Sequence, residues 1–103
     1  MKYALDFLPE VYQDVQEAYD WYEKQSIGLG EDLLLSIDDV IDSIHRKPLL
    51  NKEVYKSIRK AKTKRFPFGI FFNVGKDTIT ILAITHLSRH PRTWQTRTKL
   101  KKK

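Results

Sequence analysis

Apolar residues in the first half of the chain recur at helical spacing, which predicts two amphipathic helices. The first begins at Pro9 and ends near Lys24, and its inner face carries Val11, Val15, Ala18 and Tyr22. After a glycine-containing turn at 26–30, a second helix is predicted up to Pro48, with an inner face of Leu33, Leu34, Ile37, Val40, Ile41 and Ile44. A short link between two helices favours an antiparallel hairpin.

Strand-like alternation takes over on either side of the helical pair. Residues 2–8 predict a short first strand, and residues 54–57 and 58–63 are weaker, basic strand candidates. Two stronger runs follow around the hairpin loop 75–77, with alternating positions at Phe68, Ile70, Phe72 and Val74, and then at Ile79, Ile81 and Ala83. This order predicts an α+β fold, in which the helical pair covers one face of a mainly antiparallel sheet of three or more strands.

The composition fits one small globular domain. The chain has 103 residues, 41% of them hydrophobic, so we expect a single domain over residues 1–98 and a basic, disordered tail at 99–103. The absence of cysteine excludes disulfides and thiolate metal sites. No apolar run approaches the roughly 20 residues that span a bilayer, and the N-terminus shows no signal-peptide pattern. These features predict a cytoplasmic protein without a membrane partner.

The charge is divided unevenly along the chain. Residues 1–44 hold two lysines and eleven acids, a net charge of −9, whereas residues 45–103 hold seventeen bases and two acids, a net charge of +15. This asymmetry predicts an acidic face and a basic face on one body, and the basic face should attract acidic macromolecules. The alternative is two solvated surfaces that attract each other and have no further role.

Candidate binding residues are the cations and the indole that surround the last strands. They are suited to phosphates and bases: Arg59, Lys62, Lys64, Arg65, Arg89, Arg92, Trp94 and Arg97. No metal or other cofactor is expected. His86 and His90 are four residues apart, which suits metal ligands only on a helix; Pro91 argues against a helix there, and no acidic residue is near in sequence.

Cleavage of RNA without a metal ion is one activity that such residues support. Lys or Arg can stabilise a pentavalent phosphate, and His can transfer protons. The candidate catalytic residues are therefore His86, Arg65 and Arg59. Structural alternatives remain open: His86 could bond a neighbouring backbone carbonyl, the basic strand at 58–65 could be a lysine-protected edge, and Trp94 could pack across the end of the core.

Several motifs together resemble the RelE/ParE superfamily of toxins from type II toxin–antitoxin systems, and more narrowly its ParE-like plasmid stabilization members. They are the RFPFGIFFNV run, the TITILAITHLSRHPRTWQTR run, and the helical stretch AYDWYEKQSIGLGEDLLLSIDDVIDSI. The resemblance covers nearly the whole chain. It implies a small sheet backed by a helical hairpin, which is the order of elements predicted above.

The resemblance also implies a function. Members of the superfamily arrest bacterial growth and are neutralised by a cognate antitoxin, typically an acidic chain that wraps the toxin. We therefore expect an antitoxin across the helical hairpin and the basic sheet. Some members cut messenger RNA on the ribosome, and ParE-type members poison DNA gyrase without known catalysis. The sequence leaves the oligomeric state open.

One departure bears on the choice between these activities. The ribosome-dependent nucleases usually carry an arginine where this chain has Gly69, and often a His or Tyr where it has Leu87 and Ser88. Losing that arginine should cost several kcal/mol of charge stabilisation at a developing phosphorane, of the order of an oxyanion-hole donor. We therefore favour a ParE-like toxin that acts on gyrase, with an RNA endonuclease or a non-toxic basic binding module as alternatives.

Overall fold

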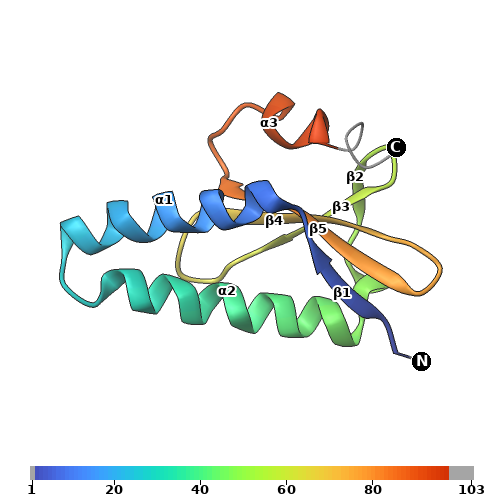
Figure 1. The fold of residues 1–103 in the computed structure, drawn as a ribbon, viewed down its shortest axis with the longest axis horizontal. Helices are drawn as coiled ribbons and strands as arrows, with labels where there is room; N and C mark the ends of the chain where they lie inside the picture. The colour runs from blue at the N-terminus through green and yellow to red at the C-terminus, as the bar shows by residue number, and fades with distance from the viewer. Residues whose placement is uncertain (1, 98–103) are drawn as a thin grey trace.

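The computed structural model describes residues 2–97, so residue 98 and the predicted basic tail at 99–103 lie outside the described residues. Figure 1 shows α1 and α2 side by side along the long axis, with α3 apart from them. The elements follow in the order β1 (Ala4–Phe7), α1 (Pro9–Gln25), α2 (Leu29–Arg46), the 3-10 turn η1 (Pro48–Leu50), β2 (Glu53–Tyr55), β3 (Ile58–Lys62), β4 (Phe68–Val74), β5 (Thr78–His86) and α3 (Arg92–Gln95).

The five strands form one sheet in the order β1-β5-β4-β3-β2. All neighbouring pairs are antiparallel except β1 and β5, which are parallel. The predicted α+β fold with a mainly antiparallel sheet is therefore confirmed. The edge-strand alternative for residues 58–65 is wrong for Ile58 and Arg59, because β2 pairs with them on the outer side of β3. The weak strand candidate at 54–57 corresponds to β2, which begins one residue earlier and is shorter.

The helical hairpin is built around the glycine-containing turn. Pro9 opens α1 as predicted, and Gly28 precedes α2 with a φ of +91°, a conformation that glycine adopts readily. The Glu23 carboxylate accepts hydrogen bonds from the amides of Gly28 and Gly30, both at 2.9 Å, and so caps the start of α2. A Cβ at Gly30 would meet the Tyr19 ring at 2.8 Å, so only glycine lets the two helices approach this closely.

Two apolar clusters cover the two faces of the sheet. The hairpin face is covered by α1 and α2, whose inner residues pack against Phe68, Ile70, Phe72, Ile79, Ile81 and Ile84. The opposite face, here called the α3 face, carries a smaller cluster of Ile58, Phe71, Leu82, Ala83 and Trp94. The α3 face is thus covered only in part. No helix within residues 2–97 is long and apolar enough to cross a membrane.

The strict alternation predicted for residues 79–84 is wrong in one respect. The register shifts within the β4–β5 pair, where Phe71 faces Ala83 but Phe72 faces Ile81. Leu82 is therefore an extra residue, and it joins Ala83 in the cluster on the α3 face. This bulge returns Ile84 to the hairpin face. Both faces of β5 are buried here, so the sequence pattern could not reveal it.

Candidate functional site

On the edge of β5 that faces away from β4, the second half of the strand lies beside α1 and has no paired strand among the described residues. β1 ends at Phe7, opposite Ile81, so no strand among the described residues pairs with 82–86 on this side. Side chains bond to part of this open edge instead. The Arg97 guanidinium donates to the carbonyl of Leu82 at 3.0 Å, and the amide of Ile84 donates to the Asp14 carboxylate at 3.0 Å.

Asp14 and Arg97 also form a buried ion pair. Arg97 donates two hydrogen bonds to the Asp14 oxygens, at 2.8 and 3.1 Å, and the side chains are 9% and 14% exposed. A bidentate, poorly solvated pair of this kind holds its geometry well. It ties the C-terminal segment to α1 and β5, so Arg97, predicted as a target contact, is occupied within the fold.

A cavity of about 350 Å³ lies next to this pair, between α1 and the ends of β4 and β5; we call it the β5 cavity. Its residues provide an aromatic wall, two carboxylates, an imidazole and a guanidinium, and they are Asp14, Glu17, Ala18, Trp21, Tyr22, Phe68, Ile84, Thr85, His86 and Arg89. Ring contacts run through the wall: Trp21 meets Tyr22 edge-on at 4.9 Å, and Phe68 meets His86 edge-on at 5.4 Å.

His86 is held at the end of β5 by its own neighbour. Its Nδ1 accepts the amide of Ser88 at 3.1 Å and lies 2.8 Å from the Ser88 hydroxyl. An Nδ1 that accepts an amide places the proton of the neutral ring on Nε2, so His86 offers a donor to the cavity that it lines. The sequence alternative was a bond to a backbone carbonyl; the structure shows a bond to a backbone amide.

The α3 face carries a second group of predicted residues. Strand register places Lys62, Gly69 and Thr85 side by side on β3, β4 and β5, and we call them the Lys62–Gly69–Thr85 row. Lys60 lies on the same face in the next row, opposite Phe71. The Thr85 hydroxyl is buried and has no hydrogen-bond partner within the described residues.

Gly69 leaves no room for a larger side chain. A Cβ at this position would lie 3.0 Å from Leu87 Cδ2 and 3.0 Å from the Phe71 ring. Leu87 and Phe71 therefore occupy the space that an arginine here would need. The centre of the row carries no cation, in keeping with the departure noted in the sequence.

The remaining predicted arginines fall into structural and exposed positions. Arg59 is largely buried and donates to the carbonyl of Asn51 at 2.6 Å, which fixes the segment before β2. Arg65 is exposed, lies 5.0 Å from the Phe66 ring and pairs with Asp32 at 3.3 Å. Arg89 is half-exposed and lies 4.0 Å from Glu17. The contacts of Arg65, Arg89 and Arg97 join the basic half to acids of the helical hairpin.

Trp94 packs within the fold, which was one of its two sequence interpretations. It is 8% exposed, and its indole stacks on Phe71 with centroids 4.2 Å apart and an interplanar angle of 14°. Its indole is therefore not available to stack on a nucleic-acid base in this conformation. Lys64 is exposed on the β3–β4 loop, and Arg92 is exposed at the start of α3.

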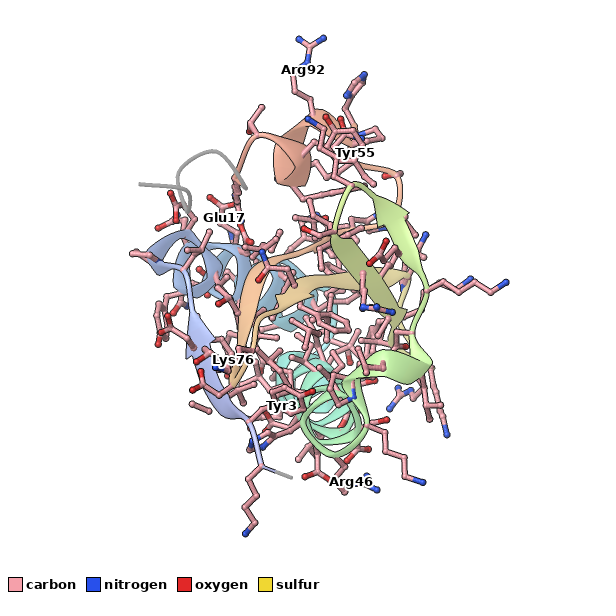
Figure 2. All side chains as sticks on the ribbon, turned by 90° about the vertical axis from the view of Figure 1, so that its right-hand side faces the viewer. Tyr3, Glu17, Arg46, Tyr55, Lys76 and Arg92 are labelled. Atoms are coloured by element: carbon pink, nitrogen blue, oxygen red, sulfur yellow. The ribbon has the colours of Figure 1, made fainter. Side chains whose placement is uncertain are left out.

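The cations do not gather on one surface as completely as the charge pattern predicted. In Figure 2, Arg92 lies above α3, Lys76 lies beside β1, and Arg46 lies at the opposite end from Arg92. The predicted site residues likewise divide into two groups. His86 and Arg89 meet in the β5 cavity, whereas Lys62 lies on the α3 face.

Sequence reasoning missed the contribution of α1 to the cavity. Asp14, Glu17, Trp21 and Tyr22 all line it, whereas the predicted helix pattern placed only Tyr22, on the inner face of the first helix. One signal was available: Asp14 follows Val11 by three positions and precedes Ala18 by four, so it lies on the apolar side of the helix. A carboxylate there requires a partner, and that partner is Arg97.

Other titratable groups give little support for metal or acid–base chemistry. Within residues 2–97 no three or more His, Cys, Asp or Glu side chains are grouped to hold a metal ion. Desolvation raises the pKa of Tyr19 above its ordinary value, with further contributions from the carboxylates of Glu23 and Glu31. Tyr19 lies over the hairpin turn, outside the cavity, and remains protonated at neutral pH.

The architecture defines the chain as a small α+β protein with a five-stranded sheet, a helical hairpin on one face and a short helix on the other. No protein-family model matches the chain, and no curated protein matches it in sequence.

Two solved structures share the fold. A chain of the chromosomal ParDE toxin–antitoxin system from P. aeruginosa gives a TM-score of 0.72 at 20% identity, over 82% of this chain and 96% of that one. E. coli toxin RelE, as an arginine-to-alanine double mutant in the free state, gives a TM-score of 0.63 at 14% identity, over 97% and 98%. The chain therefore has a RelE/ParE-like fold, as the sequence resemblance implied.

Proposed function

We propose that this chain is the toxin of a bacterial type II toxin–antitoxin pair, which arrests growth and is neutralised by a cognate antitoxin. Two observations support the proposal. The fold is shared with a chain of a ParDE system and with RelE over nearly their full lengths. The net charge of +15 over residues 45–103 suits an acidic partner. The proposed site of action is the cytoplasm.

We propose further that the toxin acts by binding DNA gyrase, as a ParE-like protein, rather than by catalysis. The Lys62–Gly69–Thr85 row carries this proposal, because its centre holds neither a cation nor a group that transfers protons. Leu87 and Phe71 crowd Gly69, so a neighbouring arginine would have to displace them to reach a phosphate there. Binding needs only the exposed cations, of which Lys62, Lys64 and Arg92 are the proposed contacts.

Cleavage of messenger RNA on the ribosome is the second candidate. It is favoured by Lys60 and Lys62, which project from one face of β3 toward the side where Thr85 lies. Two lysines could stabilise a phosphorane without a metal. Primer extension on translated messages tests this candidate. Cuts that disappear in the Lys62→Ala variant would establish it, and intact messages in arrested cells would remove it.

Growth arrest is the test of the toxin proposal itself. The chain is expressed from a tightly controlled promoter in a bacterium, and viable cells are counted over time. We expect colony counts to stop rising after induction and to recover when a cognate antitoxin is co-expressed. Normal growth in cells that contain the folded chain would refute the proposal. A variant unfolded by Ile81→Asp serves as the control for expression burden.

A further inference from the structure

The open edge of β5 has two backbone groups for which residues 2–97 provide no hydrogen-bond partner. Thr63 donates its amide to the carbonyl of Phe68, so the backbone groups of Phe68 point toward β3. His86 lies opposite Phe68 in a pair that is not hydrogen-bonded, so the backbone groups of His86 point away from β4. Ile84 points the same way, because its amide reaches Asp14. The carbonyl of His86 already accepts the amide of Arg89 at 3.0 Å. The outward groups that are left are the carbonyl of Ile84 and the amide of His86.

These two groups define the direction of a strand that could be added. In an antiparallel pair, a partner residue bonds both the amide and the carbonyl of the residue opposite it. Neither Ile84 nor His86 offers both groups, because the Ile84 amide bonds Asp14 and the His86 carbonyl bonds the amide of Arg89. A parallel partner residue bonds the carbonyl of one residue and the amide two positions later. The carbonyl of Ile84 and the amide of His86 therefore suit one residue of a parallel segment, placed opposite Thr85. Such a segment would run in the same direction as β1.

The β5 cavity lies where side chains of such a segment would point. Residues on either side of the one opposite Thr85 would face the hairpin side, at the levels of Ile84 and His86. Trp21, Tyr22 and Phe68 form the aromatic part of the cavity wall, and Phe68 pairs with His86 in the strand register. The Arg89 guanidinium, which also lines the cavity, provides positive potential.

We propose that this edge and cavity bind an extended segment of the neutralising partner, with a large apolar side chain and a carboxylate two residues apart. The proposal deepens the proposed function, since the partner is the antitoxin. The segment adds as a short parallel strand to β5, the apolar side chain contacts Trp21, and the carboxylate replaces Glu17 beside Arg89. The Glu17–Arg89 contact is 4.0 Å long between half-exposed side chains, so its loss costs little.

Charge and exposure favour this occupant over a nucleic acid. A nucleic acid would bring several phosphates against the carboxylates of Asp14 and Glu17 on the inner wall, whereas the proposed segment brings one carboxylate, to Arg89. Trp21 is 57% exposed although it belongs to the aromatic wall, which leaves apolar surface for a partner to cover. Strand addition explains all of these features together, because backbone bonds give affinity and alternate side chains give specificity.

A library of short, random, linear peptides displayed on phage provides the probe. The full chain is used for selection, and affinities of enriched synthetic peptides are measured by calorimetry. We expect a large apolar residue and an acidic residue two positions apart among them. Trp21→Ala and Arg89→Glu should each weaken binding by about tenfold or more, as loss of an anchor does. Leu35→Ala on α2 and Lys76→Glu in the β4–β5 loop are matched exposed controls and should leave affinity unchanged.

Hydrogen exchange distinguishes strand addition from other modes of binding. The amide of His86 should exchange at least about tenfold more slowly when a peptide is bound. The amide of Leu87, which already bonds the carbonyl of Pro67 at 2.8 Å, should not change. An unprotected His86 amide, affinities insensitive to Trp21 and Arg89, or a selection without enriched peptides would each overturn the inference.

The outcome can be separated from that of the toxin proposal. A chain that stops growth but leaves the His86 amide unprotected by any peptide remains a toxin, and only the inferred docking mode fails. A chain that binds such peptides at this edge but leaves growth unaffected keeps the docking site, and the toxin proposal fails.

Discussion

Removal of the Asp14 carboxylate should destabilise the fold more than removal of any exposed acid. In the Asp14→Ala variant, the Arg97 guanidinium stays buried with only the carbonyl of Leu82 as a partner. The amide of Ile84 loses its acceptor as well. Because the two charged side chains are only 9% and 14% exposed, water can compensate for little of this loss without local opening.

The size of the effect follows from the burial of the pair. Breaking a buried ion pair by removing one partner typically costs about 3–5 kcal/mol. For a small domain whose unfolding free energy is about 5–15 kcal/mol, this is a large share of the total stability. With a urea slope of about 1.5 kcal/mol/M, the unfolding midpoint should fall by about 2–3 M. Replacing both partners, in Asp14→Leu with Arg97→Met, should restore much of the loss.

Urea unfolding followed by circular dichroism measures these changes. The matched control is Asp42→Ala, which removes an ion pair with Arg46 whose side chains are both 68% exposed. Its cost should stay within about 0.5 kcal/mol. The reasoning is refuted if Asp14→Ala lowers the midpoint no more than Asp42→Ala does, because the pair would then not hold the β5 edge to α1.

Three further substitutions probe other parts of the fold, each measured by urea or thermal unfolding. Trp94→Ala should cost about 3–5 kcal/mol, because it leaves a cavity over Phe71; a cost below about 1 kcal/mol would mean that α3 is not firmly packed. Gly69→Arg should cost about 1–3 kcal/mol through displacement of Leu87, and an unchanged midpoint would contradict the crowding described. Glu23→Ala should cost about 1–2 kcal/mol, since two amides lose their acceptor; Glu10→Ala, which caps no such turn, is the comparison.

The helices were predictable because one face of each is buried and the other is solvated. Apolar spacing, Pro9 and the glycine-containing turn located α1 and α2 within a few residues. β4 and β5 were predictable as strands, but the bulge at Leu82 was not. Seven of the nine residues of β5 are buried, so a residue inserted into the alternation leaves no polar position out of place.

The candidate site was less predictable because its parts are distant in the chain. Asp14 and Arg97 are 83 positions apart, and no local pattern pairs them. His86 and Arg89 were predicted as site residues next to the last strand, and they line one cavity. Arg59 was selected by charge alone, and its hydrogen bond to Asn51 shows a structural use that only the tertiary fold reveals.

The supercoiling activity of purified DNA gyrase tests the proposed mode of action most directly. The account expects supercoiling of relaxed plasmid to fall in proportion to added chain, and to recover when the antitoxin is added. Lys64→Glu or Arg92→Glu should weaken this inhibition while the unfolding midpoint stays unchanged. Full supercoiling at a molar excess of a preparation that still arrests growth would contradict the account.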